Sequence, residues 1–409
     1  MPPLDEAPLA SDSGASRPNR APVMAFVTDI STEMTLREGL EDVVPEKFEF
    51  RRAGIRVATS MLANMPTPLT LIVDLSGEQN PMAALSDLSQ VVEPDVRVLV
   101  VGDRDDVMFY RQVTRDMGAL EYLHKPLIRD VVARHFGPIL SRQAVSQDAM
   151  VGGRLVTVTG VRGGVGASTV AANLSYYFGV EARRHTLLLD TDLHRGMCAM
   201  LLGARAGSGL RTALEAPARI DELFVERVSQ PAGDRLHLLA GEERLTEQPA
   251  YAAGGAAKLS EALRRRFNYV VADLPFTGQP LHRDLLHLAH QRVLVMSPTL
   301  ASIRDTLRLL AIPNGPAQPR RAVVVLNRAG MQGSLDTRRV ADALKMQPDV
   351  VIPDVKRSVE RAASLGKPVA QERGPFRNGM IALAREVGFT QRDTGAPAAK
   401  KRGWLPWRK

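Results

Sequence analysis

Residues 155–178 read LVTVTGVRGGVGASTVAANLSYYF and indicate more about the architecture of this chain than any other stretch. They open with an apolar run of strand type, cross a glycine-rich turn and continue with a helical pattern. Glycines in such a turn let backbone N–H groups point inward around an anion, and the following helix adds the positive end of its dipole. The residues expected around phosphate oxygens are Arg162, Gly163, Gly164, Val165, Gly166, Ala167, Ser168 and Thr169. A tight strand-to-helix turn without a ligand is the alternative.

The composition of the 409 residues is that of a globular, multidomain protein. A single cysteine, Cys198, excludes a disulfide within the chain and fits a reducing compartment. No signal peptide and no membrane-spanning run are recognisable, so we expect a cytoplasmic protein. Of the net charge of +8, five positive charges lie in the last ten residues, KKRGWLPWRK, and we expect the remainder to be spread thinly. A general DNA-binding surface is therefore not expected.

Ahead of the glycine-rich turn, strands and helices alternate from Val23 onward. The runs VMAFVT (23–28), LTLIVDLS (69–76) and VRVLVVG (96–102) are of buried-strand type, and LEYLHKPL (120–127) closes the series. This rhythm predicts a parallel sheet covered on both faces. We therefore expect an α/β protein with two doubly wound parallel sheets. The expected division is a disordered N-terminus over 1–21, a first domain over 22–147, a second over 153–390 and a basic tail over 391–409.

The first domain resembles a response-regulator receiver, which has a flavodoxin-type fold. Asp74, at the end of its strand, matches the phosphoacceptor, and Lys125 with the following proline matches the receiver lysine. Receivers carry a pair of acids after their first strand, whereas only Asp29 is present here, and Gly102 stands where they carry Ser or Thr. Because a carboxylate needs a divalent ion to accept a phosphoryl group, we expect a protein-docking module without phosphotransfer. A working receiver, or an Asp74 that only caps the next helix, are the alternatives.

The glycine-rich loop resembles the deviant Walker A motif of the ParA/MinD superfamily, usually written KGGxGK[ST]. Arg162 replaces its leading lysine, Ala167 replaces its second lysine, and Val161 replaces the usual first glycine. Three later stretches also match the superfamily in the correct order: TLLLDTDLHRG (186–196), NYVVADLPF (268–276) and AVVVLNRAG (322–330) with VIPDV after it. The resemblance implies that the chain binds ATP and Mg²⁺.

The same resemblance implies roles for individual residues. Mg²⁺ would be held by Ser168, Asp190 and Asp273, and the base would be contacted by Asn327, Arg328 and Pro353. Asp192 would lie nearest the attacking water if any hydrolysis occurs, although Asp190 and Asp192 could also be simple helix caps. Arg162 would reach across a homodimer to the partner's nucleotide, or would be merely solvated.

The replacement of the loop lysine by Ala167 has an energetic cost. A charge-assisted contact to phosphate contributes about 1.5–3 kcal/mol, so its loss weakens binding roughly 10- to 150-fold. The transition state should suffer more, because charge that moves there needs a fixed cation. We therefore expect a chain that binds ATP and hydrolyses it slowly or not at all.

A receiver-like domain precedes a ParA/MinD-like domain whose phosphate loop lacks its lysine. This combination resembles the TadZ/CpaE proteins of Flp (Tad) pilus assembly. That resemblance implies a localisation factor at the cell pole that binds ATP, dimerises and contacts Tad secretion components or a polar landmark protein. The alternative is a cycling ParA/MinD-like ATPase that positions cargo on the membrane or nucleoid. Trp404 and Trp407 lie among the basic residues of the tail. The tail could thus make weak peripheral contact with the inner face of the membrane, or serve a protein partner.

Overall fold

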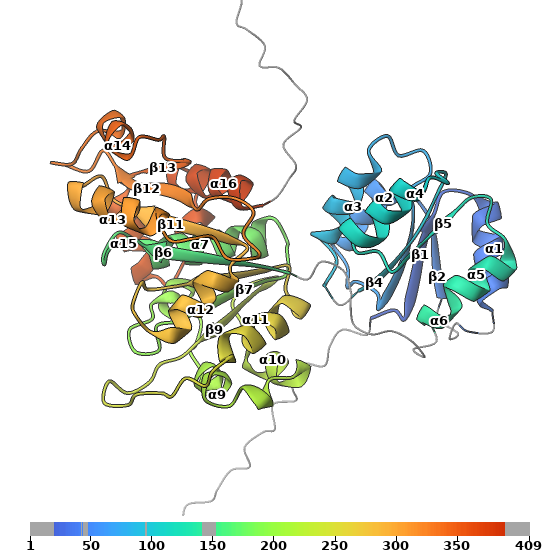
Figure 1. Ribbon diagram of the computed structural model, residues 1–409, viewed down its shortest axis with the longest axis horizontal. Coiled ribbons are helices and arrows are strands. Elements are labelled where there is room, and N and C mark those ends of the chain that lie inside the picture. Colours follow the sequence, from blue (N-terminus) through green and yellow to red (C-terminus); the bar gives the residue numbers. More distant parts are fainter. Residues whose placement is uncertain (1–19, 42, 44–47, 95, 141–152, 389–409) are drawn as a thin grey trace, which may run out of the picture. The chain divides into compact units, whose positions relative to one another are not determined.

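The computed structural model describes residues 20–41, 43, 48–94, 96–140 and 153–388 (Figure 1). Its contacts divide the chain into two compact units, Met1–Gly152 (unit 1) and Gly153–Lys409 (unit 2). Each unit contains one sheet with helices on both of its faces, so the expected α/β class is confirmed. The basic tail and all but Arg20 and Ala21 of the expected disordered N-terminus lie outside the described residues. No described helix is long and apolar enough to cross a membrane.

Unit 1 has a five-stranded parallel sheet in the order β2-β1-β3-β4-β5, which is the flavodoxin-type order. Its strands are β1 (Val23–Val27), β2 (Phe48–Arg52), β3 (Thr70–Asp74), β4 (Arg97–Gly102) and β5 (Glu121–His124). Its helices are α1 (Ile30–Leu40), α2 (Ile55–Leu62), α3 (Pro81–Ser89), α4 (Val107–Arg111), α5 (Arg129–His135) and α6 (Gly137–Leu140). Alternate residues of β1 enter different cores: Met24 and Phe26 pack on one face of the sheet, and Ala25 packs on the other.

Strand β2 was not predicted from the sequence. We expected a polar helical stretch after β1, but α1 covers only the first part of it, and FEFRR then forms an edge strand beside β1. Its five residues are half-buried or exposed, because an edge strand carries charges that a central strand would exclude. The helical segment after β4 runs from Val107 to Asp116, and its second half, Gln112–Asp116, is a π-helical turn that continues α4.

Unit 2 has an eight-stranded sheet in the order β13-β12-β11-β6-β10-β7-β9-β8, parallel except for β8. Its strands are β6 (Arg154–Gly160), β7 (Thr186–Asp190), β8 (Gln230–Pro231), β9 (Leu236–Ala240), β10 (Tyr269–Asp273), β11 (Gln291–Met296), β12 (Val323–Ala329) and β13 (Val350–Pro353). Its helices are α7 (Ala167–Tyr176), α8 (Cys198–Leu202), α9 (Gly209–Glu215), α10 (Glu222–Val228), α11 (Gly255–Arg266), α12 (Pro280–Leu288), α13 (Leu300–Leu310), α14 (Thr337–Leu344), α15 (Lys356–Ser364) and α16 (Pro375–Val387).

The position of β6 determines where a ligand can bind in unit 2. This strand lies between β10 and β11, and the chain leaves it toward β7 on one side before it later returns to β11 on the other. A crevice forms where the winding direction of a parallel sheet reverses, outside the carboxyl ends of the strands. The glycine-rich loop, which follows β6, lies at that edge of the sheet.

Candidate functional site

The loop between β6 and α7 has the backbone that its glycines allow. Gly164 and Gly166 have φ angles of +78° and +92°, in the left-handed region that favours glycine. A Cβ added at Gly163 or Gly164 would meet nothing within 4 Å, so this part of the loop borders open space. A Cβ added at Gly166 would lie 2.5 Å from Asn327 Nδ2. Glycine is therefore required at 166 by the backbone and by the packing together.

Helix α7 directs its first turn at a cavity of about 570 Å³, which we call the loop cavity. Its N-cap, Gly166, offers no side-chain hydrogen bond to the first turn. Backbone N–H groups without a capping acceptor, at the positive end of a helix, form an anion-binding site. The loop cavity is lined by residues 160–169 and, among others, by Asp192, Arg195, Asp273, Phe276, Arg328 and Val359.

The ends of β7 and β10 place two acids together beside the loop. Asp190 and Asp273 are register partners in the parallel ladder, and both are buried. Cys198 completes a cluster whose carboxylate and thiol ligand atoms lie within 4.8 Å of one another. Its backbone N–H donates to Asp190 Oδ2 over 3.0 Å, and its Sγ donates to Asp273 Oδ2 over 3.5 Å. We expected the two acids at this position, whereas no sequence motif indicated that Cys198 would lie beside them.

The electrostatics of this acid cluster favour a cation. Burial and the charge of Asp190 raise the pKa of Asp273 to about 7, although hydrogen bonds from Ser168 and Cys198 oppose the rise. Burial likewise raises the pKa of Asp190, and that of the Cys198 thiol well above its usual value. A divalent cation would offset the cost of two buried negative charges. Ser168, Asp190 and Asp273 thus fit the coordination of Mg²⁺ by oxygen ligands.

Asp192 borders the loop cavity and also organises its own turn. Its Oδ1 accepts hydrogen bonds from the backbone N–H groups of His194 (3.2 Å) and Arg195 (3.0 Å). Asp192 therefore caps a turn and not a helix, since α8 begins only at Cys198, and its place on the wall of the loop cavity leaves it next to any ligand there.

Asn327 and Arg328 lie in an irregular part of β12. The register with β13 shifts between Leu326 and Ala329, and Arg328 has a φ of +58°. Asn327 Nδ2 donates to the Val165 carbonyl over 2.8 Å, so its amide braces the phosphate-binding loop. This contact with the loop was not expected, and it leaves Asn327 Oδ1 as the group that can face a ligand.

Asn327, Arg328 and Pro353 line a second cavity of about 390 Å³, which we call the β12 cavity. The loop cavity and the β12 cavity have Gly166, Thr169, Arg328 and Val359 in common. The two cavities therefore meet, and together they offer a polar end at the loop and a second chamber beside β13. A nucleotide has this division into phosphates and nucleoside.

Arg162 is held within its own chain. Its Nη1 donates to Asp305 Oδ2 over 2.9 Å, and the Arg162 side chain is 47% exposed. Asp305 belongs to α13, 143 residues away in the sequence, and nothing in the loop motif indicates this partner.

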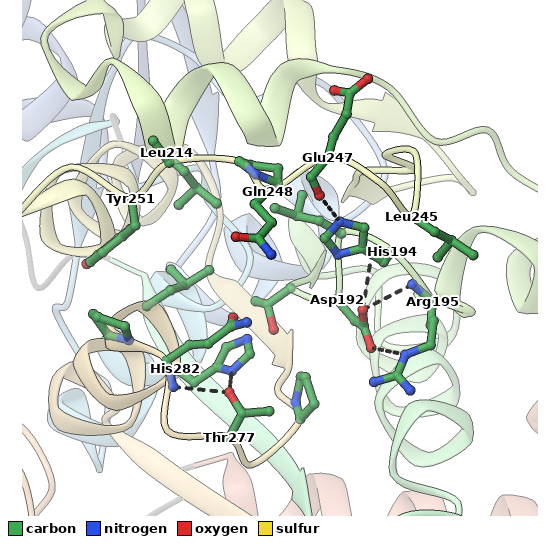
Figure 2. A pocket seen from close by; sticks show the side chains of 18 residues that line it. Asp192, His194, Arg195, Leu214, Leu245, Glu247, Gln248, Tyr251, Thr277 and His282 are labelled. Atoms are coloured by element: carbon green, nitrogen blue, oxygen red, sulfur yellow. Dashed lines mark hydrogen bonds and ion pairs between the residues drawn. The ribbon is translucent and has the colours of Figure 1, made fainter.

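A third cavity, of about 610 Å³, adjoins the loop cavity (Figure 2). It shares Asp192, Arg195, Pro275 and Thr277 with the loop cavity. Thr277 Oγ1 lies 2.6 Å from His282 Nδ1, and burial lowers the pKa of His282. The walls come from the segments after β7, β9 and β10, which is why the sequence did not reveal this cavity.

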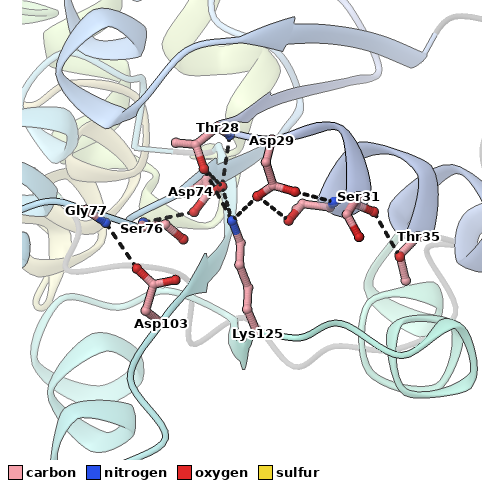
Figure 3. A network of polar contacts seen from close by, with 10 residues as sticks. Thr28, Asp29, Ser31, Thr35, Asp74, Ser76, Gly77, Asp103 and Lys125 are labelled. Atoms are coloured by element: carbon pink, nitrogen blue, oxygen red, sulfur yellow. Dashed lines mark hydrogen bonds and ion pairs between the residues drawn. The ribbon is translucent and has the colours of Figure 1, made fainter.

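The acids of unit 1 meet a cation instead of an open cavity (Figure 3). Lys125 Nζ donates to Asp74 Oδ2 and to Asp29 Oδ2, in both cases over 2.6 Å. Asp74 Oδ2 also accepts from the backbone N–H (2.9 Å) and the hydroxyl (2.6 Å) of Thr28, and Asp74 Oδ1 accepts from Ser76 N (2.9 Å). Both oxygens of the expected phosphoacceptor are therefore already engaged.

The pKa values of these two acids reflect that engagement. Burial alone would raise the pKa of Asp74, but hydrogen bonds from Lys125, Ser76 and Thr28 lower it below its usual value. Burial would also raise the pKa of Asp29, but hydrogen bonds from Lys125 and Thr32 lower it to about 2. The carboxylates of Asp29 and Asp74 are thus ionised, and Lys125 offsets part of their charge.

Gly102 has a packing reason in this structure. A Cβ added at Gly102 would lie 3.0 Å from the hydroxyl of Tyr122. That hydroxyl donates to the Arg104 carbonyl over 2.6 Å and accepts from Arg104 N over 3.1 Å. The missing Ser or Thr side chain thus makes room for a fixed tyrosine.

Comparison with known proteins identifies relatives of unit 2. No family model matches the chain. The septum site-determining protein MinD from Bacillus subtilis (strain 168) is 22% identical over 227 residues, which cover 54% of this chain and 83% of that protein. A match of this length is longer than unit 1 and must include unit 2. Unit 2 is homologous to MinD.

The similarity to one solved structure, a ParA family ATPase, extends to the fold. A ParA family ATPase from Chlorobium tepidum TLS is 19% identical, with a TM-score of 0.51, and covers 56% of this chain and 98% of its own. MinD from Pyrococcus horikoshii OT3, complexed with Mg-ADP, is 20% identical, with a TM-score of 0.49, and covers 57% and 95%. A pilus assembly protein CpaE from Caulobacter crescentus CB15 is 29% identical, with a TM-score of 0.26, and covers 29% and 97%.

The basic charge is less confined to the tail than we expected. Residues 300–388 of the MinD-homologous unit contain 15 Lys and Arg but eight Asp and Glu. The expectation that the excess outside the tail is spread thinly was therefore wrong. These residues form the β12–β13 edge of the sheet with α13 to α16.

Proposed function

We propose that unit 2 binds ATP together with Mg²⁺ and hydrolyses it slowly. The observation that carries this proposal is an intact loop cavity, with acids and Ser168 in place, in which Ala167 occupies the lysine position. The loop N–H groups would donate to phosphate oxygens, and Ser168, Asp190 and Asp273 would hold the ion. Bound Mg²⁺ would supply positive charge to the phosphates. Asp273 must first release its proton near neutral pH.

Slow hydrolysis follows from what Ala167 lacks. A methyl side chain cannot stabilise the negative charge that develops on the transferred phosphoryl group, whereas the ammonium of a lysine can. Calorimetry with a non-hydrolysable ATP analogue and Mg²⁺ should show binding to the full chain. A turnover number in the ordinary enzyme range of roughly 1–1000 per second would refute slow hydrolysis, and absence of analogue binding would refute the site.

We also infer a nucleotide-favoured homodimer through the loop-cavity face of unit 2. Met197, Met200 and Phe276 border the loop cavity with exposures of 44%, 49% and 47%. Large apolar side chains gathered at the mouth of a polar cavity favour burial against a partner, and a second copy offers the same surface. Arg162, also at this mouth, is the cation nearest to such a partner's phosphates once it leaves Asp305.

The dimer is tested by light scattering of the full chain with and without the ATP analogue. Arg162→Ala should weaken the nucleotide-dependent dimer and leave the fold intact, while Arg338→Ala on α14 is the matched control. Dimerisation of Arg162→Ala equal to that of the parent would refute a trans role for Arg162.

For the whole chain we propose a localisation and scaffold factor for assembly of Flp (Tad) pili at the cell pole. The support is the combination of a receiver-like unit whose acids are closed by Lys125 with a MinD-homologous unit that lacks the loop lysine. Unit 1 would dock a Tad secretion component or a polar landmark protein without phosphotransfer. A fluorescent fusion should form polar foci, and deletion of the gene should abolish the pili. A diffuse fusion together with normal pili would refute this role.

One observation favours the second candidate, a cycling ATPase that positions cargo on an anionic surface. Residues 300–388 carry an excess of seven positive charges, and clustered Lys and Arg attract lipid head groups and DNA. Rapid turnover stimulated by anionic vesicles or DNA would support this candidate. Slow turnover that neither additive stimulates would leave the scaffold.

A further inference from the structure

We propose that Arg328 supplies, from β12, the cation that the phosphate-binding loop lacks at Ala167. The inference rests on the proposed binding of ATP and adds a residue that replaces the missing lysine in the same chain. Arg328 was expected only beside the base, because it follows Asn327 in the sequence.

Three arginines line the loop cavity among the described residues, and they differ in their partners. Arg162 is engaged by Asp305 over 2.9 Å. Arg195 has 82% of its side chain exposed and lies 3.8 Å from Asp192. Arg328 is exposed as well, and its side chain has no hydrogen bond or ion pair with any part of the chain that the structure describes. Of the three, Arg328 is thus the cavity arginine that no acid engages.

The backbone of Arg328 is built to direct this side chain. Its φ of +58° is rare for a residue with a Cβ, and such strain persists only where the surroundings enforce it. Two contacts enforce it here: Asn327 Nδ2 donates to the Val165 carbonyl (2.8 Å), and Met331 N donates to the Arg328 carbonyl (3.1 Å). The bulge in β12 therefore couples the position of Arg328 to the phosphate-binding loop itself.

Arg328 lies where the two cavities meet. It lines both the loop cavity and the β12 cavity, together with Gly166 and Thr169 at the start of α7. The phosphates nearest the nucleoside must pass this junction. A guanidinium can bind two phosphate oxygens at once through its planar fork. Arg328 therefore contacts the phosphates close to the nucleoside and stabilises bound ADP and ATP alike.

Binding of three probes separates this role from a contact with the base. Calorimetry with Mg²⁺ would compare adenosine, ADP and a non-hydrolysable ATP analogue on the full chain. Arg328→Gln should weaken ADP and analogue binding roughly 10- to 150-fold, which is the value of a charge-assisted phosphate contact, and leave adenosine unchanged. Arg338→Gln, an exposed arginine on α14 outside all of these cavities, should change none of the three.

Two further variants make the test specific. Ala167→Lys should restore ADP binding to Arg328→Gln, because it returns a cation to the bound phosphates. Arg328→Gly should unfold at a higher temperature than the parent, since glycine adopts the left-handed backbone without strain, and yet bind ADP as weakly as Arg328→Gln. Arg328→Gly thus keeps a loss of binding distinct from a loss of fold.

Each outcome decides the proposal. Selective loss of phosphate binding, rescued by Ala167→Lys, supports it. Unchanged ADP binding in Arg328→Gln, or an equal loss for adenosine and ADP, overturns it while the proposed ATP binding stands. A parent chain that binds none of the three probes overturns both.

Discussion

Both units end parallel strands in buried acids, but the two acid sites have opposite electrostatics. In unit 1 the acids Asp29 and Asp74 share the ammonium of Lys125, and their pKa values are lowered. In unit 2 the pKa values of Asp190 and Asp273 are raised, and no described Lys or Arg side chain contacts either acid. Burial does not explain the contrast between Asp74 and Asp190, because both are only 1% exposed, whereas the side chain of Asp29 is 45% exposed.

The difference shows that the partner of a buried carboxylate, and not its depth, decides what the site can do. Lys125 offsets one of the two negative charges of Asp29 and Asp74, and it occupies an oxygen of each acid. This arrangement fits our expectation that Asp74 takes no part in phosphoryl transfer. The acids of unit 2 accept hydrogen bonds from Ser168, Cys198 and the backbone of Asp192, and no cationic side chain among the described residues contacts them. Docking by unit 1 and ligand binding by unit 2 are the roles that we propose for the two sites.

The largest expected effect comes from removing a charge at the acid site of unit 2. The folded pKa of Asp273, about 7, exceeds its unfolded value near 3.8. The folded state therefore holds the extra proton, and the contribution of Asp273 to the unfolding free energy of unit 2 falls as pH rises from about 4 to about 7. This contribution has a slope of at most about 1.4 kcal/mol per pH unit, and the lowered pKa values of His237 and His290, each about 4, oppose it. Asp273→Asn should remove the contribution of Asp273, stabilise the apo protein at pH 8 by on the order of 2–4 kcal/mol relative to the parent, and abolish Mg²⁺-dependent nucleotide binding.

Hydrogen exchange of β10 peptides across this pH range would follow unit 2 separately from unit 1. Glu261→Gln, a half-exposed acid on α11, is the control and should leave the slope unchanged. An Asp273→Asn chain with the parental pH dependence would contradict the assigned cause.

The opposite change removes the cation, Lys125, from the acid site of unit 1. Lys125→Met leaves Asp74 buried without its cation, and removal of one partner from a buried pair costs about 3 kcal/mol or more. The unfolding free energy of unit 1 should fall accordingly at pH 7 and recover below about pH 4, because the acids can then be protonated. Hydrogen exchange of β3 peptides measures it. Arg37→Met, which breaks an exposed pair with Glu33, should have little effect, and an equal effect of the two changes would argue against the special place of Lys125.

Adding a cation to the acid site of unit 2 should make it resemble the acid site of unit 1. Ala167→Lys should lower the pKa of Asp273 and so reduce the contribution of Asp273 to the pH dependence of the unfolding free energy. It should also tighten binding of the ATP analogue roughly 10- to 150-fold, equivalent to about 1.5–3 kcal/mol. Calorimetry and hydrogen exchange report these changes, and Ala167→Met controls for side-chain size. Tighter binding in Ala167→Met as well would show that volume, not charge, is what the loop lacks.

The smallest expected effect is the absence of a reaction. Acetyl phosphate with Mg²⁺ should leave the intact mass of the chain unchanged, because both oxygens of Asp74 are engaged and Lys125 takes the place of a metal. Lys125→Ala tests whether the lysine is what blocks the site. An adduct on the parent chain that disappears in Asp74→Ala would overturn this expectation.

Much of this protein follows from local sequence pattern. The glycine-rich loop, the acids at the strand ends and the apolar runs of parallel strands were all recognisable, because each is set by residues adjacent in the chain. The strand order of unit 1 and the meeting of Asp190 with Asp273 then follow from the general rules of parallel sheets. Strand β2 was not predicted, because its charged edge residues do not form the apolar run that is typical of a buried strand.

Only the tertiary structure decided which side chain each functional group meets. Lys125 meets Asp29 across 96 positions, Arg162 meets Asp305 across 143, and Asn327 meets Val165 across 162. No local pattern encodes such pairs, since they depend on how loops from different strands converge at one edge of a sheet. The sequence alone therefore indicates that the chain has two strand-end acid sites. The fold determines that Lys125 contacts both acids of one site, and that the other site borders the loop cavity, which Arg328 also lines.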